Sequence, residues 1–111
     1  MIGKKTFSAE IVSADLKRQR GLGGRNSLCK GCSMLFVFPS QDLWGIWMKG
    51  MKFDLDIIWI SGNRIVKIEK KVSKDSKNTL YPEEQADKVL ELNAGAIDEK
   101  GIRVGDMVEI K

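Results

Sequence analysis

Apolar and polar side chains alternate with a period of two over several stretches of the chain, which is the spacing of β-strands rather than of helices. In residues 6–12, Phe7, Ala9 and Ile11 alternate with polar positions. Residues 65–72 repeat this pattern, with apolar side chains on one side and lysine or glutamate on the other. Each stretch is therefore predicted to be a strand that covers the core with one face.

Other apolar stretches carry large side chains at nearly every position, which indicates strands buried on both faces. Residues 34–38 are apolar throughout, and residues 55–60 place Leu55, Ile57 and Trp59 on one face against Asp56, Ile58 and Ile60 on the other. We expect 55–60 to be the central strand. Shorter strands are predicted at 44–48, 89–92 and 107–110 because these runs are rich in aromatic or β-branched residues.

Turn and cap residues separate these strands. Gly62-Asn63 suits the tight turn of a hairpin between 55–60 and 65–72. Two short helices are predicted, at 14–20 after a Ser13 cap and at 94–100 after an Asn93 cap. The chain is thus expected to be a single domain, 1–111, with a mainly β fold: an antiparallel sandwich or barrel of about seven strands with two short helices.

Composition and charge limit the classes of function that the chain can have. The chain has 111 residues, of which 42% are hydrophobic, which is enough for one core. No apolar run is long enough to span a membrane as a helix, so we expect a soluble, cytoplasmic protein without a membrane partner. The net charge is +4, with lysines clustered between positions 67 and 77. These lysines fit a solvated sheet edge, and weak nucleic-acid binding through basic residues is the alternative.

Cys29-Lys30-Gly31-Cys32 forms a single CxxC motif. Structural zinc needs four ligands, and the chain contains no histidine, so no metal and no other cofactor are predicted. A redox-active pair would have its first cysteine at a helix N-terminus, whereas a strand-like stretch follows here. A local disulfide or two reduced thiols is the expected state, and zinc shared between two chains is the remaining alternative.

Asp56 is the most informative polar residue, because a carboxylate inside an apolar strand is costly without a cation or several hydrogen bonds. Lys49 and Arg18 are its candidate partners. One interpretation is a structural ion pair. The other is a ligand site in which Arg18 and Lys49 hold a polar or anionic group, Trp47 forms an aromatic wall, and Asp56 completes the cluster. Trp44 and Trp59 are interpreted as core residues.

The order of these pieces resembles the DUF192 family over nearly the whole chain. The resemblance implies a mainly antiparallel, jelly-roll-like β fold with no established catalytic residues. A double-psi barrel is the alternative topology, because a Gly-Asp turn before a closing strand also occurs there. Gly50, Asp54 and Gly23 depart from the family pattern, and the CxxC is not a family feature. The segments that carry the resemblance are Arg18-x-x-Gly21-Leu22 with Arg25 and Leu28, Met34-Leu35-Phe36-Val37-Phe38-Pro39, Trp47-Met48-Lys49, Leu55-Asp56-Ile57-Ile58, Tyr81-Pro82, Val89-Leu90-Glu91-Leu92-x-Ala94-Gly95 and Gly101-Ile102-x-Val104-Gly105-Asp106.

These patterns favour a binding or accessory module over an enzyme. No nucleophile-elbow pattern occurs, and no serine or cysteine can have a histidine beside it, so no catalytic residues are predicted and hydrolase-type chemistry stays an alternative. We predict a non-catalytic domain that binds a polar or anionic small ligand or a protein partner, as a monomer or weak homodimer. The candidate ligand-binding residues are Arg18, Trp47, Lys49 and Asp56.

Overall fold

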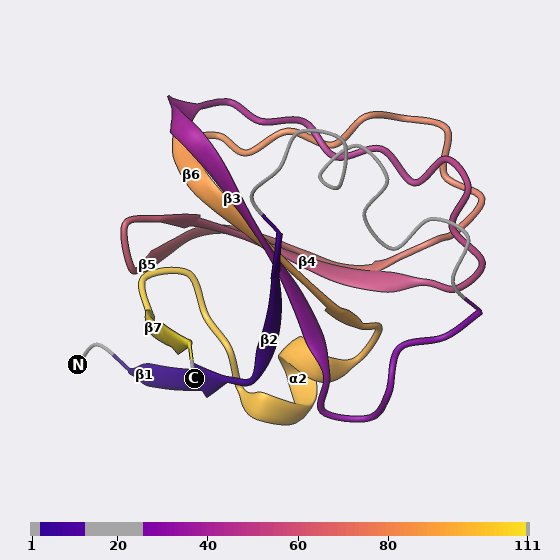
Figure 1. Ribbon diagram of the computed structural model, residues 1–111, viewed down its shortest axis with the longest axis horizontal. Coiled ribbons are helices and arrows are strands. Elements are labelled where there is room, and N and C mark those ends of the chain that lie inside the picture. Colours follow the sequence, from indigo (N-terminus) through magenta and orange to yellow (C-terminus); the bar gives the residue numbers. More distant parts are fainter. Residues whose placement is uncertain (1–2, 13–25, 111) are drawn as a thin grey trace.

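Seven strands and one short helix make up the part of the chain that the computed structural model describes, residues 3–12 and 26–110 (Figure 1). The strands form one sheet in the order β1-β7-β5-β4-β6-β3-β2, curled into a half-barrel. Their bounds are β1 Lys4–Phe7, β2 Ala9–Val12, β3 Ser33–Asp42, β4 Leu55–Ser61, β5 Arg64–Val72, β6 Ala86–Asn93 and β7 Met107–Ile110, and the helix α2 spans Ala96–Lys100. The predicted mainly β fold and the strand count are confirmed.

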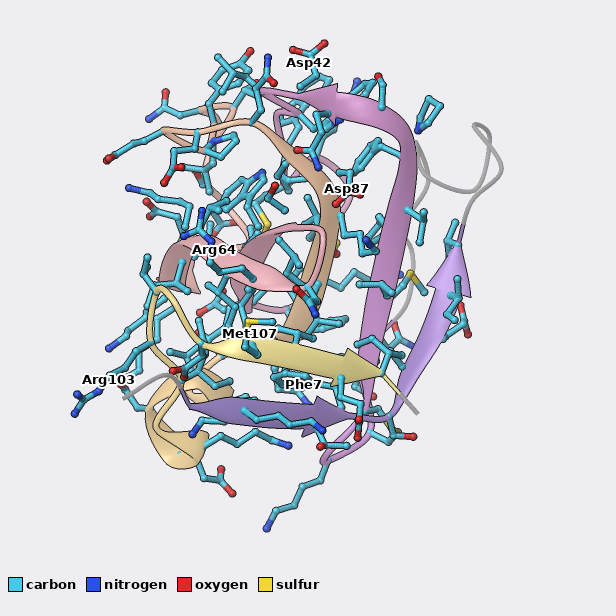
Figure 2. All side chains as sticks on the ribbon, turned by 90° about the vertical axis from the view of Figure 1, so that its left-hand side faces the viewer. Phe7, Asp42, Arg64, Asp87, Arg103 and Met107 are labelled. Carbon is cyan, nitrogen blue, oxygen red and sulfur yellow. A yellow bond between two sulfur atoms is a disulfide. The ribbon has the colours of Figure 1, made fainter. Side chains whose placement is uncertain are left out.

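The prediction of a purely antiparallel sandwich or barrel is wrong, because the structure has a single sheet of mixed direction. The predicted strand at 6–12 is in fact two strands that meet at Ser8. β1 pairs in parallel with β7, and β2 pairs in parallel with β3. Figure 2 shows β1 and β7 side by side, pointing in the same direction. One continuous stretch therefore builds both edges of the sheet, and the Ser33 hydroxyl donates to the Ser8 carbonyl at 2.9 Å where they meet.

The centre of the sheet agrees with the prediction for residues 55–60. β4 lies between β5 and β6, pairs antiparallel with both, and is buried over residues 55–60. The predicted hairpin is confirmed: Ser61 pairs with Arg64, and Gly62 adopts a positive φ of 64°. Such a turn joins antiparallel strands without splaying them.

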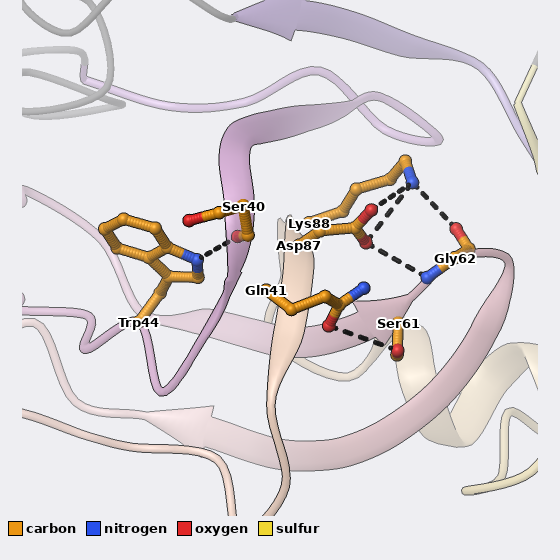
Figure 3. A network of polar contacts seen from close by, with 7 residues as sticks. All are labelled: Ser40, Gln41, Trp44, Ser61, Gly62, Asp87 and Lys88. Atoms are coloured by element: carbon orange, nitrogen blue, oxygen red, sulfur yellow. Dashed lines mark hydrogen bonds and ion pairs between the residues drawn. The ribbon is translucent and has the colours of Figure 1, made fainter.

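The turn of this hairpin is also tied to β6, as Figure 3 shows. The Asp87 carboxylate accepts the Gly62 amide at 3.0 Å, and the Lys88 ammonium donates to the Gly62 carbonyl at 2.8 Å. Ser61 contacts Gln41 at the end of β3 at 3.3 Å. Side chains from two other strands therefore hold the β4–β5 turn.

The two faces of the sheet bury separate cores. Helix α2 covers one side, which we call the helix-covered face, and connecting segments cover the other, the loop-covered face (Figure 1). The helix-covered core contains Phe7, Leu35, Ile58, Ile60, Ile65, Leu90, Leu92, Ile97 and Ile102. The loop-covered core contains Val12, Met34, Phe36, Met48, Leu55, Ile57, Trp59, Val66, Val72, Ala86 and Val89. Two-sided burial explains why the central strands lack a polar face.

The second predicted helix is present as α2, but its cap differs from the prediction. Gly95 rather than Asn93 is the N-cap, and it has no side-chain cap hydrogen bond of its own. The Asn93 amide instead donates to the carbonyls of Leu28 and Cys29. The predicted helix at 14–20, with Ser13, lies outside the described residues. Among the residues that are described, no helix is long and apolar enough to cross a membrane.

Candidate functional site

Residues 43–54 form the segment that covers the loop-covered face between β3 and β4. The predicted strand at 44–48 is absent, and the structure has a single antiparallel bridge there, from Ile46 to Leu80, with backbone hydrogen bonds of 2.8 Å in both directions. Burial nevertheless alternates from one residue to the next in this segment. Met48 is buried at 1% exposure, whereas Trp47 and Lys49 on either side of it are exposed. Met48 therefore fixes the position of its two neighbours.

Trp47 and Lys49 come together at the surface. The Lys49 ammonium lies 5.0 Å from the centroid of the Trp47 ring, within the range of a cation–π contact. Trp47 is 57% exposed, which is unusual for the largest apolar side chain. The pair thus presents a positive charge beside a flat aromatic surface, a combination suited to binding.

Tyr81 adds a second exposed aromatic ring close to this segment. It is 60% exposed and follows Leu80, the bridge partner of Ile46. Its ring lies across Gly45, because a Cβ at that position would be 2.7 Å from the Tyr81 ring. The glycine therefore creates the space in which the tyrosine rests.

The prediction that Trp44 and Trp59 are core residues is confirmed for Trp59, whereas Trp44 is only half-buried. Trp59 is fully buried, and its indole N–H donates to the Trp44 carbonyl at 2.8 Å. Trp44 is half-buried, stacks on Phe38 with ring centroids 4.5 Å apart, and donates its indole N–H to the Ser40 carbonyl (Figure 3). Both indole groups thus hold the start of the 43–54 segment in place.

Asp56 is fully buried on the helix-covered face, and its hydrogen bonds come from the backbone. One oxygen accepts the Lys71 amide at 2.8 Å, and the other accepts Gly95 at 3.1 Å and Ile97 at 2.7 Å. The bond from Ile97 caps α2 from a neighbouring strand. Lys71 has a φ of 51° at an irregularity of the β4–β5 pairing, which turns its N–H toward the carboxylate. Three amide donors take the place of the cation that the sequence suggested.

The four candidate ligand-binding residues are therefore separated as follows. The structure brings Trp47 and Lys49 together, and it places Asp56 within the helix-covered core, on the opposite face of the sheet from the core that Met48 joins. Arg18 lies outside the described residues. No ion pair between Asp56 and Lys49 occurs in the described part of the chain. A ligand-binding role for the four residues stays a prediction.

Glu91 is a polar residue that the sequence analysis did not single out. Glu91 lies in β6 and pairs with Met34 on β3 and with Ile57 on β4, both in the loop-covered core. It is 6% exposed. Burial raises the pKa of Glu91 to about 7. The sequence alone could not show this burial, because it depends on which strands flank β6 and on their register.

The lysine-rich region is largely neutralised by neighbouring carboxylates. Lys67 contacts Glu83 at 3.1 Å and Lys74 contacts Asp75 at 3.2 Å. The hydrogen bond and charge of Lys70 hold the pKa of Asp98 below its usual value. Beyond Arg64, β5 has no strand paired on its outer edge among the described residues. These pairs favour the interpretation of a solvated sheet edge.

Cys29 and Cys32 form a disulfide, one of the two states expected from the sequence. The Cys32 amide donates to the Cys29 carbonyl at 2.9 Å, which closes a tight turn with Gly31 at a φ of 78°. This turn leads directly into β3. Because Asn93 donates to the Cys29 carbonyl, the turn is also attached to the end of β6.

Comparisons with known proteins agree with this architecture. A protein of unknown function from Novosphingobium aromaticivorans DSM 12444 has a similar structure, with a TM-score of 0.86, 26% identity, and coverage of 91% of this chain and 73% of that one. A Sinorhizobium meliloti 1021 protein named a "putative transcription regulator" gives a TM-score of 0.86 and 29% identity, with coverage of 89% of this chain and 78% of that one. No curated protein matches the sequence significantly. The model of DUF192, described as "Uncharacterized ACR", matches residues 1–110, and the chain therefore belongs to the DUF192 family.

Proposed function

We propose that this domain is a non-catalytic binding module and that Trp47 and Lys49 form its recognition surface. The observation that carries the proposal is the exposed Trp47 ring with the Lys49 ammonium 5.0 Å from its centroid. The two residues are held by a buried anchor, Met48, between them. A rigidly anchored aromatic side chain beside a charge is the kind of residue that dominates binding energy at interfaces.

The chemistry of this surface favours an anionic group attached to a flat or apolar body. The Lys49 ammonium has three donors, which suit a carboxylate or phosphate oxygen. The Trp47 ring offers a face for the apolar part of the same molecule. A carboxylate-bearing or phosphate-bearing small molecule, or an acidic segment of a partner protein, meets both requirements.

Thermal-shift screening of such anions, followed by titration calorimetry of the compounds that raise the melting temperature, tests this proposal. Trp47→Ala and Lys49→Met are expected to fold and to weaken binding by tenfold or more, because both side chains are exposed and contribute little to the core. Leu43→Ala and Lys52→Met are matched controls: both residues are exposed and lie on the same segment, and both variants should bind normally.

The control variants also define the result that would contradict the proposal. If binding is lost equally in Leu43→Ala and Lys52→Met, the recognition surface is not centred on Trp47. If no anion and no acidic peptide changes the melting temperature of the wild-type protein, the proposal of an anion-binding module fails.

Nucleic-acid binding is a second candidate function. It is favoured by the net charge of +4 and by the description of the Sinorhizobium meliloti protein as a "putative transcription regulator". The ion pairs of Lys67, Lys70 and Lys74 weigh against it, because paired lysines release fewer counterions. Fluorescence anisotropy with random oligonucleotides should show binding that disappears by about 0.2 M salt. Sequence-selective binding above that salt concentration would place this function first.

A further inference from the structure

Glu91 differs from every other buried polar side chain among the described residues. The buried carboxylates of Asp56 and Asp106 and the hydroxyl of Ser33 each have at least one hydrogen-bond donor or acceptor within reach. Glu91 has no hydrogen bond and no ion pair in the described structure, although it is only 6% exposed. A buried carboxylate without a donor is costly, so its presence calls for an explanation.

Among the described residues, the surroundings of Glu91 supply no donor. Its cross-strand neighbours, Met34 and Ile57, are apolar. Asn93, two residues further on the same face of β6, uses its amide nitrogen for the carbonyls of Leu28 and Cys29 at 2.9 and 3.2 Å. Both N–H groups of that amide are thereby used, and Asn93 can offer only its oxygen, which is an acceptor. The site is therefore rich in acceptors and lacks a donor.

The charged groups near this face do not compensate for the missing donor. Asp56 points to the other face of the sheet, and Lys30, Lys49, Lys52 and Asp54 on the covering segments are all exposed and form no described ion pair with Glu91. The carboxylate is nevertheless accessible. No side-chain oxygen of the described residues is both completely sealed and without a partner, so the Glu91 oxygens retain contact with solvent. A small group can reach them.

We propose that Glu91 is the anchoring residue of a second binding site, which takes the ammonium or guanidinium group of an amine-bearing ligand. The cation supplies both the charge and the N–H donors that the site lacks, and a guanidinium can form two parallel hydrogen bonds to one carboxylate. This site is independent of the Trp47 surface, and its failure would leave the proposed function unaffected.

NMR titration of the Glu91 side-chain carboxyl carbon, in the full chain with and without n-butylguanidinium, tests the proposal. The signal is assigned by its loss in Glu91→Gln. The cation is expected to lower the midpoint of the Glu91 titration by one pH unit or more, since it binds only the ionised form. Neutral n-butylurea, which has nearly the same shape, and sodium chloride at equal concentration should leave the midpoint unchanged.

Variants separate a specific site from a general effect of charge. Glu91→Gln should abolish the rise in melting temperature that n-butylguanidinium causes, and Glu99→Gln, an exposed carboxylate on α2, should retain it. If Glu91→Gln does not fold, the carboxyl signal is assigned through its scalar couplings to the Glu91 backbone, and the wild-type titration decides. An unchanged midpoint with n-butylguanidinium overturns the proposal. It is equally overturned if Arg18→Ala or Arg25→Ala raises the midpoint in the free protein, because the cation would then belong to the chain itself.

Discussion

Two buried carboxylates on neighbouring strands, Asp56 on β4 and Glu91 on β6, differ in the hydrogen bonds that they accept. Asp56 accepts three backbone amides and joins β4 to β5 and to α2. Glu91 lies on the other side of the same sheet and has no donor among the described residues. Amide donors can stabilise a buried charge without any cation, so Asp56 serves the fold. Glu91 costs stability and is the better candidate for a functional role.

Asp56→Ala is predicted to destabilise the domain severely, by roughly 3 kcal/mol or more, because three buried amide groups lose their acceptor. Asp56→Asn should lose less, since one oxygen remains, but its NH₂ group faces an amide donor. Urea denaturation of both variants measures the difference. Lys49→Met, which alters no contact of Asp56, should stay within about 0.5 kcal/mol of wild type. A loss in Lys49→Met as large as in Asp56→Ala would show that the two residues are coupled.

The raised pKa of Glu91 predicts that its contribution to the stability of the domain falls as pH rises. Its pKa is raised from 4.5 to about 7 in the folded protein, so the folded state holds this proton more tightly than the unfolded state. The contribution of Glu91 to the free energy of unfolding should be highest below the unfolded pKa, decrease through the interval up to the folded pKa, and change no further above it. The total loss is about 3 kcal/mol.

Urea denaturation between about pH 5 and pH 8 measures this dependence. Glu91→Gln cannot ionise, so its stability should exceed that of wild type at the upper end of the range and approach it at the lower end. Glu99→Gln serves as the exposed control. Parallel profiles for wild type and Glu91→Gln would show that Glu91 ionises normally.

At the scale of elements, the segments that precede β3 and β4 cover the loop-covered face of the sheet. The Cys29–Cys32 turn leads into β3, and residues 43–54 lead into β4 through Met48. Neither segment has a regular hydrogen-bonding ladder. A disulfide, a single β-bridge and a few buried side chains hold these segments in place. Each of these contacts can be removed separately by mutation.

Replacing both cysteines by serine is predicted to lower the free energy of unfolding by roughly 2 kcal/mol, the value expected from chain entropy for so short a loop. A reducing agent should lower the stability of the wild-type protein by a similar amount and leave the double variant unchanged. Urea denaturation with and without dithiothreitol measures both effects. Equal stability of the oxidised wild type and the variant would show that the disulfide does not hold this turn.

The sequence patterns predicted elements well where one physical effect dominates. β4, its hairpin with β5, and β7 follow from burial and turn chemistry in consecutive residues. The split at Ser8 could not be predicted, because it depends on two parallel partners, β3 and β7, that lie far along the chain. The stretch expected as a strand at 44–48 is rich in aromatic and β-branched residues, but a single bridge, from Ile46 to Leu80, is its only pairing among the described residues.

Two of the residues that the sequence singled out, Trp47 and Lys49, lie together at the surface of the structure. A ligand-binding role for them stays a prediction. The partners of Asp56 could not be read from the sequence, since the backbone of α2 and an irregular residue in β5 supply them. Glu91 was missed because its burial depends on the register of three strands.

For the molecule as a whole, Asp56 and the proposed recognition residues Trp47 and Lys49 lie on opposite faces of the half-barrel. The helix-covered face is closed by α2 (Figure 1). The hydrogen bonds of Asp56 to Gly95 and Ile97 join the start of this helix to β4. The loop-covered face carries the exposed Trp47, Lys49 and Tyr81 above its core. A ligand should therefore perturb one face and leave the other unchanged, because a packed sheet separates them.

The indole N–H signals of the three tryptophans, followed by NMR during titration with an anion found by thermal shift, test this account most directly. Trp44 and Trp59 donate their indole groups to carbonyls within the protein, whereas Trp47 is 57% exposed. We predict that the Trp47 signal, assigned by its loss in Trp47→Phe, moves with ligand concentration while the Trp59 signal and the amides of α2 stay in place. Movement of the α2 amides with an unmoved Trp47 signal would contradict the account.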